Sequence, residues 1–298
     1  MKIHDCFMFS DENMILDIRL NVLNKYVDQF VIVESKYKHN GEIKNKHFDI
    51  SKFSKFKNKI KYIYLDQEPE GLISINNQDN ENKINSNLIF NTYLRENYQR
   101  NMINEGISEA NKKDIIIIGD IDEIPNLASL DFNSEKNNLI LFRQKMFYYK
   151  LNLFYKELVW IGSRACTKNK LKSPQWLRNV KSKKYSIWRI DTLFSKKKYN
   201  NVKFIDKGGW HFTNMKNPEE IFSKLNSFLH HVDFKASGLN LIDVKKMVSE
   251  KKILYDHFAD QRKIDKWNSP VVLQPVEISF LPDYVIHNKE KFKAWLEL

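Results

Sequence analysis

The sequence predicts an α/β domain in which helices flank a mixed, mainly parallel central sheet. Over residues 1–120, strand-like segments alternate with helix-like segments, an order typical of parallel strands joined by right-handed crossovers. Two segments, 30–33 and 114–118, are nearly continuous apolar runs rich in β-branched residues, as expected for strands buried on both faces. With 42% apolar residues among 298, the chain can bury a large core, which excludes a wholly disordered protein.

The first 65 residues contain three strand segments and one helix. The apolar segment 3–9 predicts the first strand, and residues 11–26 carry apolar residues at helical spacing, with Ser10 in the N-cap position. A second strand is predicted at 30–33 and ends at the polar pair that follows it. The alternating segment 61–65 predicts the third strand.

A polar loop and a long helix lead to the strongest strand prediction in the sequence. Residues 66–86 are rich in Asn, Asp, Gln and Glu, and we interpret them as a long surface loop and a candidate lid. Residues 87–106 have apolar residues at helical spacing. The segment 114–118, with four consecutive isoleucines, predicts a fully buried strand.

After residue 120 the predicted strands become shorter, and the end of the chain becomes helical. Four further strands are predicted at 139–147, 160–163, 186–194 and 202–205. Asn217 is a helix N-cap, with Pro218 at the first helical position and two acids near the positive end of the helix dipole. The apolar stripe of this helix comprises Ile221, Leu225, Phe228 and Leu229. We therefore divide the chain into a main domain at 1–235 and a helical C-terminal appendage at 236–298.

Glycine is scarce, with 8 residues in 298, and its placement excludes two common ways of binding phosphate. Neither G-x-G-x-x-G nor G-x-x-x-x-G-K-[ST] occurs, and both motifs need glycines where the backbone approaches phosphate. A phosphate-containing ligand would therefore be held by side chains or by a metal. The adjacent pair Gly208 and Gly209 indicates a backbone position that needs a positive φ or a close approach.

Three carboxylates follow the isoleucine strand directly. Asp120, Asp122 and Glu123 stand in the sequence G-D-I-D-E-I-P, at the carboxyl end of a predicted parallel strand, where ligands bind in open α/β sheets. A divalent cation relieves the repulsion among such acids, and oxygen ligands suit Mg²⁺ or Mn²⁺. The alternative is a solvated turn whose acids cap the next helix.

Two other positions accompany the acids. Arg100 and Asn101 end the predicted helix before the isoleucine strand, so the guanidinium could contact a phosphate or hold a carboxylate. His211 follows the glycine pair and could ligate a metal through a neutral imidazole. The alternatives are an ordinary surface arginine and a histidine packed in the core.

Charge and cysteine content bear on the partners and on the compartment. The formal net charge is +12, and lysine clusters at 181–184 and 196–198 are either solvated or attract anionic substrates or membrane headgroups. Cys6 and Cys166 form no disulfide framework or zinc spacing, and the sequence contains no N-glycosylation acceptor, secretory signal or membrane-spanning run. We therefore expect a cytoplasmic protein, with peripheral association at the inner face of a membrane as a further expectation.

Two rival functions fit parts of the sequence. A metal-dependent nucleic-acid-processing enzyme would combine a basic charge with an acidic metal cluster, but such enzymes scatter their carboxylates over several elements. A non-catalytic glycan- or lipid-binding module would leave the acids as turn residues. We expect no nucleic-acid partner, and the sequence does not define the oligomeric state.

Six short motifs stand in a fixed order along residues 3–235. They are Asp5-Cys6-Phe7, Asp17-Ile18-Arg19-Leu20, Val31-Ile32-Val33-Glu34-Ser35 with His39 and Gly41, Gln99-Arg100-Asn101, Asp120-Ile121-Asp122-Glu123-Ile124-Pro125 and Gly209-Trp210-His211-Phe212. In this order they resemble glycosyltransferase family 17, the family of the bisecting β-1,4-mannosyl-glycoprotein N-acetylglucosaminyltransferases.

The resemblance implies a GT-A-like fold, a UDP-sugar donor, a D-x-D site for Mn²⁺ or Mg²⁺ and inversion at the anomeric carbon. It implies that the sugar is N-acetylglucosamine and that the acceptor is a hydroxyl of a glycan or glycolipid. Asp120 and Asp122 would then serve the ribose and the metal–diphosphate, and His211 would approach the metal or the phosphate. The residues implied for the donor site are Phe7, Glu34, Arg100, Asn101 and Asp120, and those implied for the metal are Asp120, Asp122 and His211.

An inverting transfer also needs a carboxylate or histidine that accepts the proton of the acceptor hydroxyl. The sequence leaves this residue open among several acids. The candidate catalytic residues are Asp122, Glu123, Asp191 and Glu219.

Overall fold

The computed structural model describes residues 1–135, 137–186, 188–227, 231–258, 266–267 and 269–297. The strands are β1 (Ile3–Phe9), β2 (Gln29–Ser35), β3 (Ile60–Leu65), β4 (Ile115–Asp120), β5 (Glu123–Pro125), β6 (Leu139–Tyr148), β7 (Leu153–Thr167), β8 (Val202–Ile205), β9 (Gly209–Thr213) and β10 (Gln274–Pro275). The α-helices are α1 (Asn13–Leu23), α2 (Glu81–Asn101), α3 (Ile103–Gly106), α4 (Pro174–Asn179), α5 (Asp191–Phe194), α6 (Pro218–Leu225), α7 (His231–Ala236), α8 (Leu241–Ser249) and α10 (Asp283–His287). A 3-10 segment, η1 (Ile50–Lys59), precedes β3.

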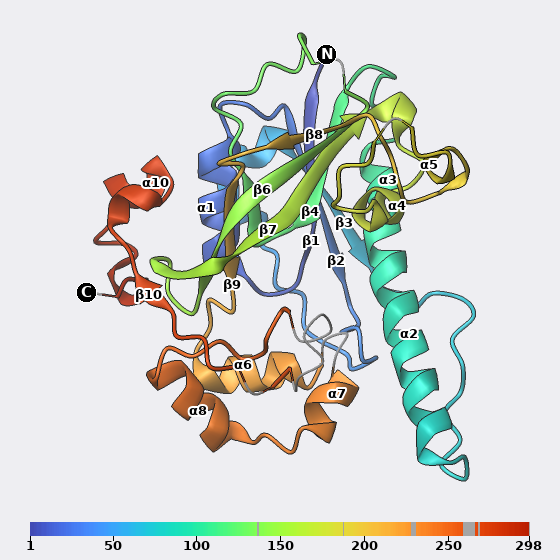
Figure 1. The fold of residues 1–298 in the computed structure, drawn as a ribbon, viewed down its shortest axis with the longest axis vertical. Helices are drawn as coiled ribbons and strands as arrows, with labels where there is room; N and C mark the ends of the chain where they lie inside the picture. Colours follow the sequence, from blue (N-terminus) through green and yellow to red (C-terminus); the bar gives the residue numbers. More distant parts are fainter. Residues whose placement is uncertain (136, 187, 228–230, 259–265, 268, 298) are drawn as a thin grey trace.

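These strands form one mixed sheet with the order β3-β2-β1-β4-β7-β6-β9-β5 (Figure 1). The first four are parallel to one another, and β7 then pairs antiparallel with both β4 and β6. β8 and β9 pair in parallel with β6, and β10 pairs with β7. The predicted α/β class, with a mainly parallel sheet flanked by helices, is therefore confirmed.

The parallel strands are buried on both faces, as their unbroken apolar sequences predict. Alternate residues of β2 belong to two different core clusters, with Phe30 and Ile32 in one and Val31 and Val33 in the other. Helix α1 covers the first face, whereas α2 and α3 cover the second (Figure 1). Helix α3 lies so close to β2 that a Cβ on Gly106 would come within 2.2 Å of the Val31 side chain.

Two predicted helix starts are wrong. Ser10 does not cap α1, because the helix begins at Asn13 and the Ser10 N–H instead donates to the Glu12 carboxylate at 3.1 Å. Helix α2 begins at Glu81, six residues before the predicted start, with Asn80 as its N-cap. Its first turns carry no regular apolar stripe because they project away from the sheet (Figure 1), so periodicity could not detect them.

The strand predicted at 186–194 is also wrong. Residues 188–190 form turns, and Asp191–Phe194 is the short helix α5. Trp188, Ile190 and Phe194 are exposed, so the apolar residues of this segment do not indicate a strand.

The C-terminal part packs on the sheet through short elements. Helix α8 and the segment after it join a core cluster with β6 and β7, whereas α10 packs against α1. The N-cap predicted at Asn217 is confirmed, and it is part of a capping box, because Asn217 and Glu220 exchange side-chain to backbone hydrogen bonds. Phe228 and Leu229, predicted to extend its apolar stripe, lie outside the described residues. No helix among the described residues is both long and apolar enough to cross a bilayer.

Candidate functional site

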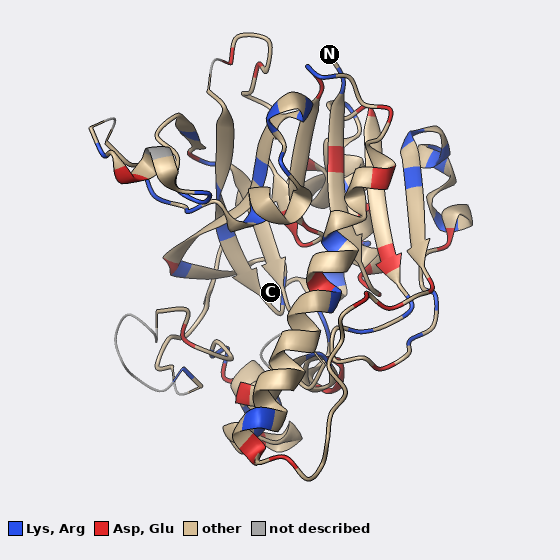
Figure 2. Cartoon of the chain, turned by 90° about the vertical axis from the view of Figure 1, so that its right-hand side faces the viewer, with Lys and Arg blue, Asp and Glu red and all other residues tan. Residues whose placement is uncertain are grey.

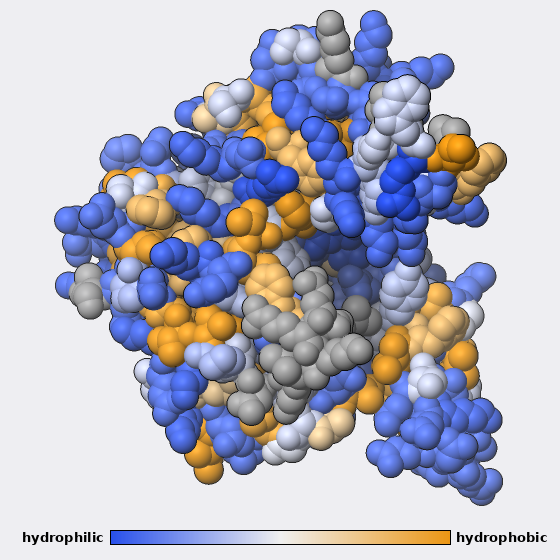
Figure 3. Space-filling view, viewed as in Figure 1, coloured by the Kyte–Doolittle hydropathy of each residue, from blue (hydrophilic) through white to orange (hydrophobic). Residues whose placement is uncertain are grey.

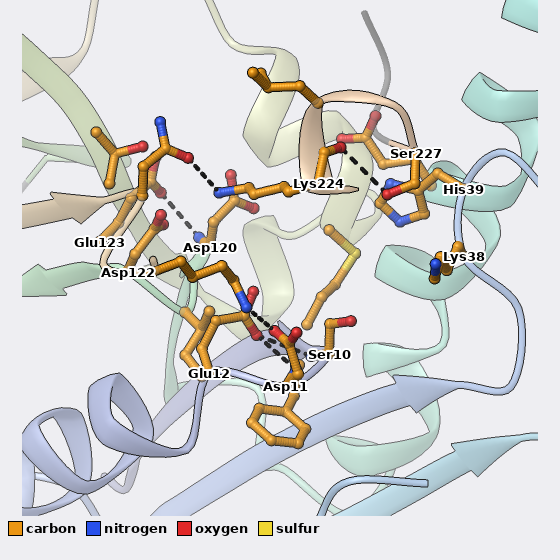
Figure 4. A pocket seen from close by; sticks show the side chains of 18 of the residues that line it. Ser10, Asp11, Glu12, Lys38, His39, Asp120, Asp122, Glu123, Lys224 and Ser227 are labelled. Carbon is orange, nitrogen blue, oxygen red and sulfur yellow. Dashed lines mark hydrogen bonds and ion pairs between the residues drawn. The ribbon is translucent and has the colours of Figure 1, made fainter. Parts of the chain in front are cut away.

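The sheet places a cavity at the point where its strand order reverses. β2 and β3 follow on one side of β1, whereas β4 lies on the other, so the crevice between the carboxyl ends of β1 and β4 is a topological switch point. A cavity of about 480 Å³ lies there, within the size range of small-molecule sites. In Figure 4, Asp120, Asp122 and Glu123 lie on one side of this cavity and Lys38 and His39 on the opposite side.

Two arginines hold the carboxylate of Asp120 at the end of β4. Arg100 donates to Oδ1 at 3.1 Å from the C-terminal end of α2, and Arg178 donates to Oδ2 at 2.7 Å from α4. Burial alone would raise the pKa of Asp120, but Arg178 and Arg100 outweigh it and hold the pKa below its usual value. Asp120 is therefore an anion in the cavity wall.

Glu123 is fully buried, and the protein occupies both of its carboxylate oxygens. Arg178 forms a fork on it with two bonds of 2.7 Å, and Trp160 donates to Oε1 at 2.6 Å. The backbone N–H of Asp120 donates to Oε2 at 2.9 Å. This carboxylate therefore fixes the turn between β4 and β5.

Another arginine, the fully buried Arg19, fixes the backbone of the same turn. Arg19 of α1 makes a bidentate pair with Asp5 of β1, at 2.7 and 2.8 Å. Its Nη1 donates to the carbonyls of Asp120, Ile121 and Glu123 at 2.8 to 3.0 Å. The backbone of the acid turn is thus positioned by a fully buried ion pair.

Asp122 and His211 face each other in the cavity. Oδ2 of Asp122 lies 3.5 Å from Nε2 of His211, and β9 brings the histidine there by pairing with β5. Burial raises the pKa of Asp122, but His211 outweighs this effect and lowers it. Nδ1 of His211 is buried and has no hydrogen-bond partner among the described residues.

The glycine pair that precedes His211 behaves as predicted. Gly209 has a φ of +122°, and a Cβ there would come within 2.1 Å of the Ile124 carbonyl oxygen. A Cβ on Gly208 would lie 2.8 Å from the backbone of Arg143. Only glycine allows β9 to approach β5 this closely, so the pair helps to bring His211 to the acid turn.

A metal fits this site only with help from a ligand. Among the described residues, no three His, Cys, Asp or Glu side chains converge so as to hold a metal ion by themselves. Asp122 offers one carboxylate, and Nε2 of His211, which faces it at 3.5 Å, offers one imidazole nitrogen. This is the pattern in which Mg²⁺ or Mn²⁺ takes its other ligands from substrate phosphates and water.

Lys224 of α6 carries a positive charge in the cavity wall. Within the part of the chain that the structure describes, its hydrogen-bond partner is the neutral side chain of Asn214. Its Nζ donates to Oδ1 of Asn214 at 3.1 Å, and its charge contributes to the lowered pKa of Asp122 (Figure 4). Asn214 is buried and has a φ of +54°, a left-handed conformation that a non-glycine residue seldom adopts. Such strained residues cluster at functional sites.

Aromatic rings form another part of the wall. The rings of Trp160 and His211 lie 5.0 Å apart, and those of Tyr255 and His257 lie 4.4 Å apart. Burial lowers the pKa of His257 to about 4, so this imidazole is neutral near pH 7. Trp160, Tyr255 and His257 therefore offer flat, uncharged surfaces in the wall next to the acid turn.

Three residues expected to bind the donor do not line the cavity. Phe7 is buried under the Arg19 guanidinium, 4.5 Å from its ring centre. The carboxylate of Glu34 accepts bonds from Tyr62 and from residues 44–48 and so holds that loop. Asn101 accepts a bond at 3.0 Å from the N–H of Gln175.

Two acids expected to be catalytic also lie outside the cavity lining. Asp191 is exposed and pairs with Arg189 and Lys198 at 2.8 Å. Glu219 is exposed and pairs with Lys245 at 2.7 Å, although the next residue, Glu220, does line the cavity.

Residues 1–173, more than half of the chain, match the model of Glycosyltransferase family 17. One solved structure, the crystal structure of HddC from Yersinia pseudotuberculosis, aligns with a TM-score of 0.30 and 10% identity over 70% of this chain and 92% of that chain. A comparison with curated proteins gave no match. The family match makes the chain a glycosyltransferase, an enzyme that moves a sugar from a donor to an acceptor. Within that class, the chain belongs to glycosyltransferase family 17.

Proposed function

We propose that this glycosyltransferase moves N-acetylglucosamine from a UDP-sugar to a hydroxyl of a glycan or glycolipid, with inversion and with Mn²⁺ or Mg²⁺. The resemblance of the sequence motifs to family 17 supports the donor, the sugar and the inversion. The observation that carries the site is the pairing of the Asp122 carboxylate with Nε2 of His211 in a cavity at the switch point of the sheet. In this proposal Asp122 and His211 hold the metal.

The transfer forms a bond between the acceptor oxygen and the anomeric carbon. The bond between that carbon and the diphosphate oxygen breaks, its electron pair leaves with UDP, and the acceptor proton passes to a base. The metal, when bound, would neutralise the charge that develops on the diphosphate. Lys224 supplies a further positive charge in the cavity wall. Fixed charges aimed at a developing anion contribute strongly to catalysis because they need no reorganisation.

The remaining predicted residues receive supporting roles in this proposal. Asp120 stays paired with Arg100 and Arg178, so it orders the donor side of the cavity instead of binding the metal alone. Glu123 is a positioning residue, because both of its oxygens are already bonded within the protein. Phe7 packs against Arg19 and Asn101 bonds Gln175, so in this proposal both stabilise residues around the cavity without lining it. We also propose a cytoplasmic location, where the buried free thiols of Cys6 and Cys166 stay reduced.

Thermal unfolding with UDP and UDP-N-acetylglucosamine, with and without Mn²⁺, tests the proposal. A ligand that binds only the folded state stabilises it by about 2.7 kcal/mol at a hundredfold excess over its Kd. We expect UDP-N-acetylglucosamine with Mn²⁺ to raise the unfolding temperature more than either component alone. D122N should lose the metal-dependent part of this shift. D191N is the matched control, because Asp191 is an exposed acid away from the cavity.

The outcomes separate the rival functions. No metal-dependent shift with any UDP-sugar, together with tight and salt-sensitive binding of DNA, would favour a nucleic-acid enzyme. A shift with free glycans but no sugar transfer would favour a binding module. An equal metal-dependent shift in D122N would show that the metal is held elsewhere.

A further inference from the structure

Residues 181–198, here called the basic loop, follow helix α4 and form a loop whose two ends are hydrogen-bonded to each other. At its base the Lys181 N–H donates to the Lys197 carbonyl at 2.7 Å. Trp176 of α4 donates to the Lys196 carbonyl at 2.9 Å, and Arg164 of β7 donates to Ser182 at 3.0 Å. These bonds fix both ends of the loop, so its tip projects from a fixed base (Figure 1).

The tip of the basic loop exposes its large apolar side chains. Trp188, Ile190 and Phe194 are 85%, 71% and 85% exposed, whereas the polar Thr192 between them is buried. In Figure 3, apolar surface stands out at the right edge, where Figure 1 places α5, among hydrophilic neighbours. Exposed apolar clusters rimmed by polar residues mark surfaces that bind a protein or a membrane.

The same loop carries much of the charge of the protein. Seven of its residues are Lys or Arg and one, Asp191, is acidic, so its net charge is +6 of the +12 of the whole chain. In Figure 2 the loop projects from the molecule at upper left, with basic positions in blue. An apolar tip surrounded by cations matches an anionic bilayer, which offers hydrocarbon below a negatively charged surface.

We propose that the basic loop docks the enzyme on an anionic lipid bilayer, with Trp188, Ile190 and Phe194 inserted at the headgroup level. A nucleic acid would satisfy the cations, but it would leave the aliphatic Ile190 exposed to water. Helix α4 joins the loop directly to the cavity, because its Arg178 bonds both Asp120 and Glu123. A single short helix therefore connects the basic loop to two acids of the cavity wall. This inference does not depend on the identity of the donor or of the metal.

Cosedimentation of the full chain with vesicles tests the docking. We expect binding to vesicles of 30% phosphatidylglycerol and 70% phosphatidylcholine and much weaker binding to phosphatidylcholine alone. Brominated phosphatidylcholine in the anionic vesicles should quench the fluorescence of Trp188. W188A should lose that quenching. W188A/F194A should weaken binding at least about tenfold, since two aromatic side chains that insert into the bilayer are lost.

The charged part of the surface is tested with a matched pair of variants. K183Q/K184Q/K197Q removes three exposed lysines of the basic loop, and each lysine near an anionic surface contributes about fivefold to binding. We therefore expect a loss on the order of a hundredfold. K52Q/K55Q/K57Q removes the same charge from exposed positions of η1 and should change binding less than about threefold at 0.15 M salt, because screening limits distant charges.

Three results would overturn the proposal. The first is equal binding to neutral and anionic vesicles. The second is an equal loss of vesicle binding in the loop and η1 triple variants, which would show that binding depends only on the net charge of the protein. The third is unchanged vesicle binding in W188A/F194A combined with weakened binding to DNA, which would identify a nucleic-acid surface instead.

Discussion

At the scale of single residues, Arg19 is the residue on which the acid turn depends most. It is fully buried, it neutralises Asp5, and one of its nitrogens donates to three carbonyls of the turn, those of residues 120, 121 and 123. Removing one partner of a buried ion pair is costly because the other charge is left buried and uncompensated. Arg19 therefore links the stability of the fold to the geometry of Asp120 and Asp122.

We predict that R19M lowers the free energy of unfolding by about 3–5 kcal/mol, measured by urea denaturation. The double variant D5L/R19M removes both charges and should recover part of that loss. R143M is the control, because Arg143 pairs with Asp206 at the surface, where such pairs contribute at most about 1 kcal/mol. A loss below 1 kcal/mol in R19M would contradict the role assigned to this pair.

Part of the candidate site could be predicted from the sequence at this scale. Asp120, Asp122, Glu123, Arg100 and His211 all line or adjoin the cavity, because a motif at the end of a buried strand reveals local chemistry. The partners that come from distant segments left no comparable signal. These are Trp160 and Lys224, which line the cavity, and Arg178, which bonds two of its acids; all three stand outside recognisable spacings and are brought there by tertiary packing.

At the scale of elements, α6 connects a helix cap to the cavity. The helix begins with the Asn217–Glu220 capping box and carries Lys224 in its last turn. Helix α8 begins with an equivalent box formed by Asn240 and Asp243, but none of its residues lines the cavity. Comparing the two helices therefore separates the effect of a cap on stability from its effect on the cavity.

We predict that N217A and N240A each lower the free energy of unfolding by about 1 kcal/mol, because each leaves backbone donors of the first turn unpaired. N217A alone should also raise the KM for the sugar donor, since fraying of α6 displaces Lys224. Urea denaturation and initial-rate kinetics measure the two effects. An unchanged KM in N217A, at the expected loss of stability, would show that Lys224 is positioned by Asn214 alone.

The predictability of the elements followed their burial. β1, β2 and β4 were predicted within a few residues because both faces pack against helices, which requires continuous apolar sequence. The segment 186–194 has a similar apolar content, yet Trp188, Ile190 and Phe194 are exposed, so periodicity alone gave the wrong element. An apolar pattern therefore indicates a strand only where a neighbouring element buries it, and the pattern does not identify that neighbour.

At the scale of the whole molecule, the C-terminal part is closely joined to the sheet. Leu254 and Leu273 share a core cluster with Met146 of β6, and Val285 of α10 packs in the cluster that contains α1. The proposed boundary after residue 235 therefore separates segments whose cores are continuous. These contacts lie far apart in the sequence, which is why a helical appendage was the most that composition could predict.

His257 belongs to this joined region and makes the stability of the whole protein depend on pH. It hydrogen-bonds with the Tyr148 hydroxyl of β6, and burial lowers its pKa to about 4, whereas an unfolded histidine titrates near 6.5. Between these values the unfolded chain binds a proton that the folded chain does not. A lowered pKa of this kind contributes stability above about pH 6.5, and the contribution is lost as the pH falls towards 4.

We predict that the free energy of unfolding falls by up to about 3 kcal/mol between pH 7 and pH 4 because of this group. H257Q should show a shallower dependence, whereas H287Q should match the parent protein, since His287 is exposed. Part of the pH dependence of the free energy of unfolding should remain in H257Q, because burial also lowers the pKa of His39 across the cavity. Urea denaturation at half-unit pH steps gives the profile. Superimposable profiles for H257Q and the parent protein would mean that the pKa of His257 is the same in the folded and the unfolded chain, which would contradict the effect assigned to its burial.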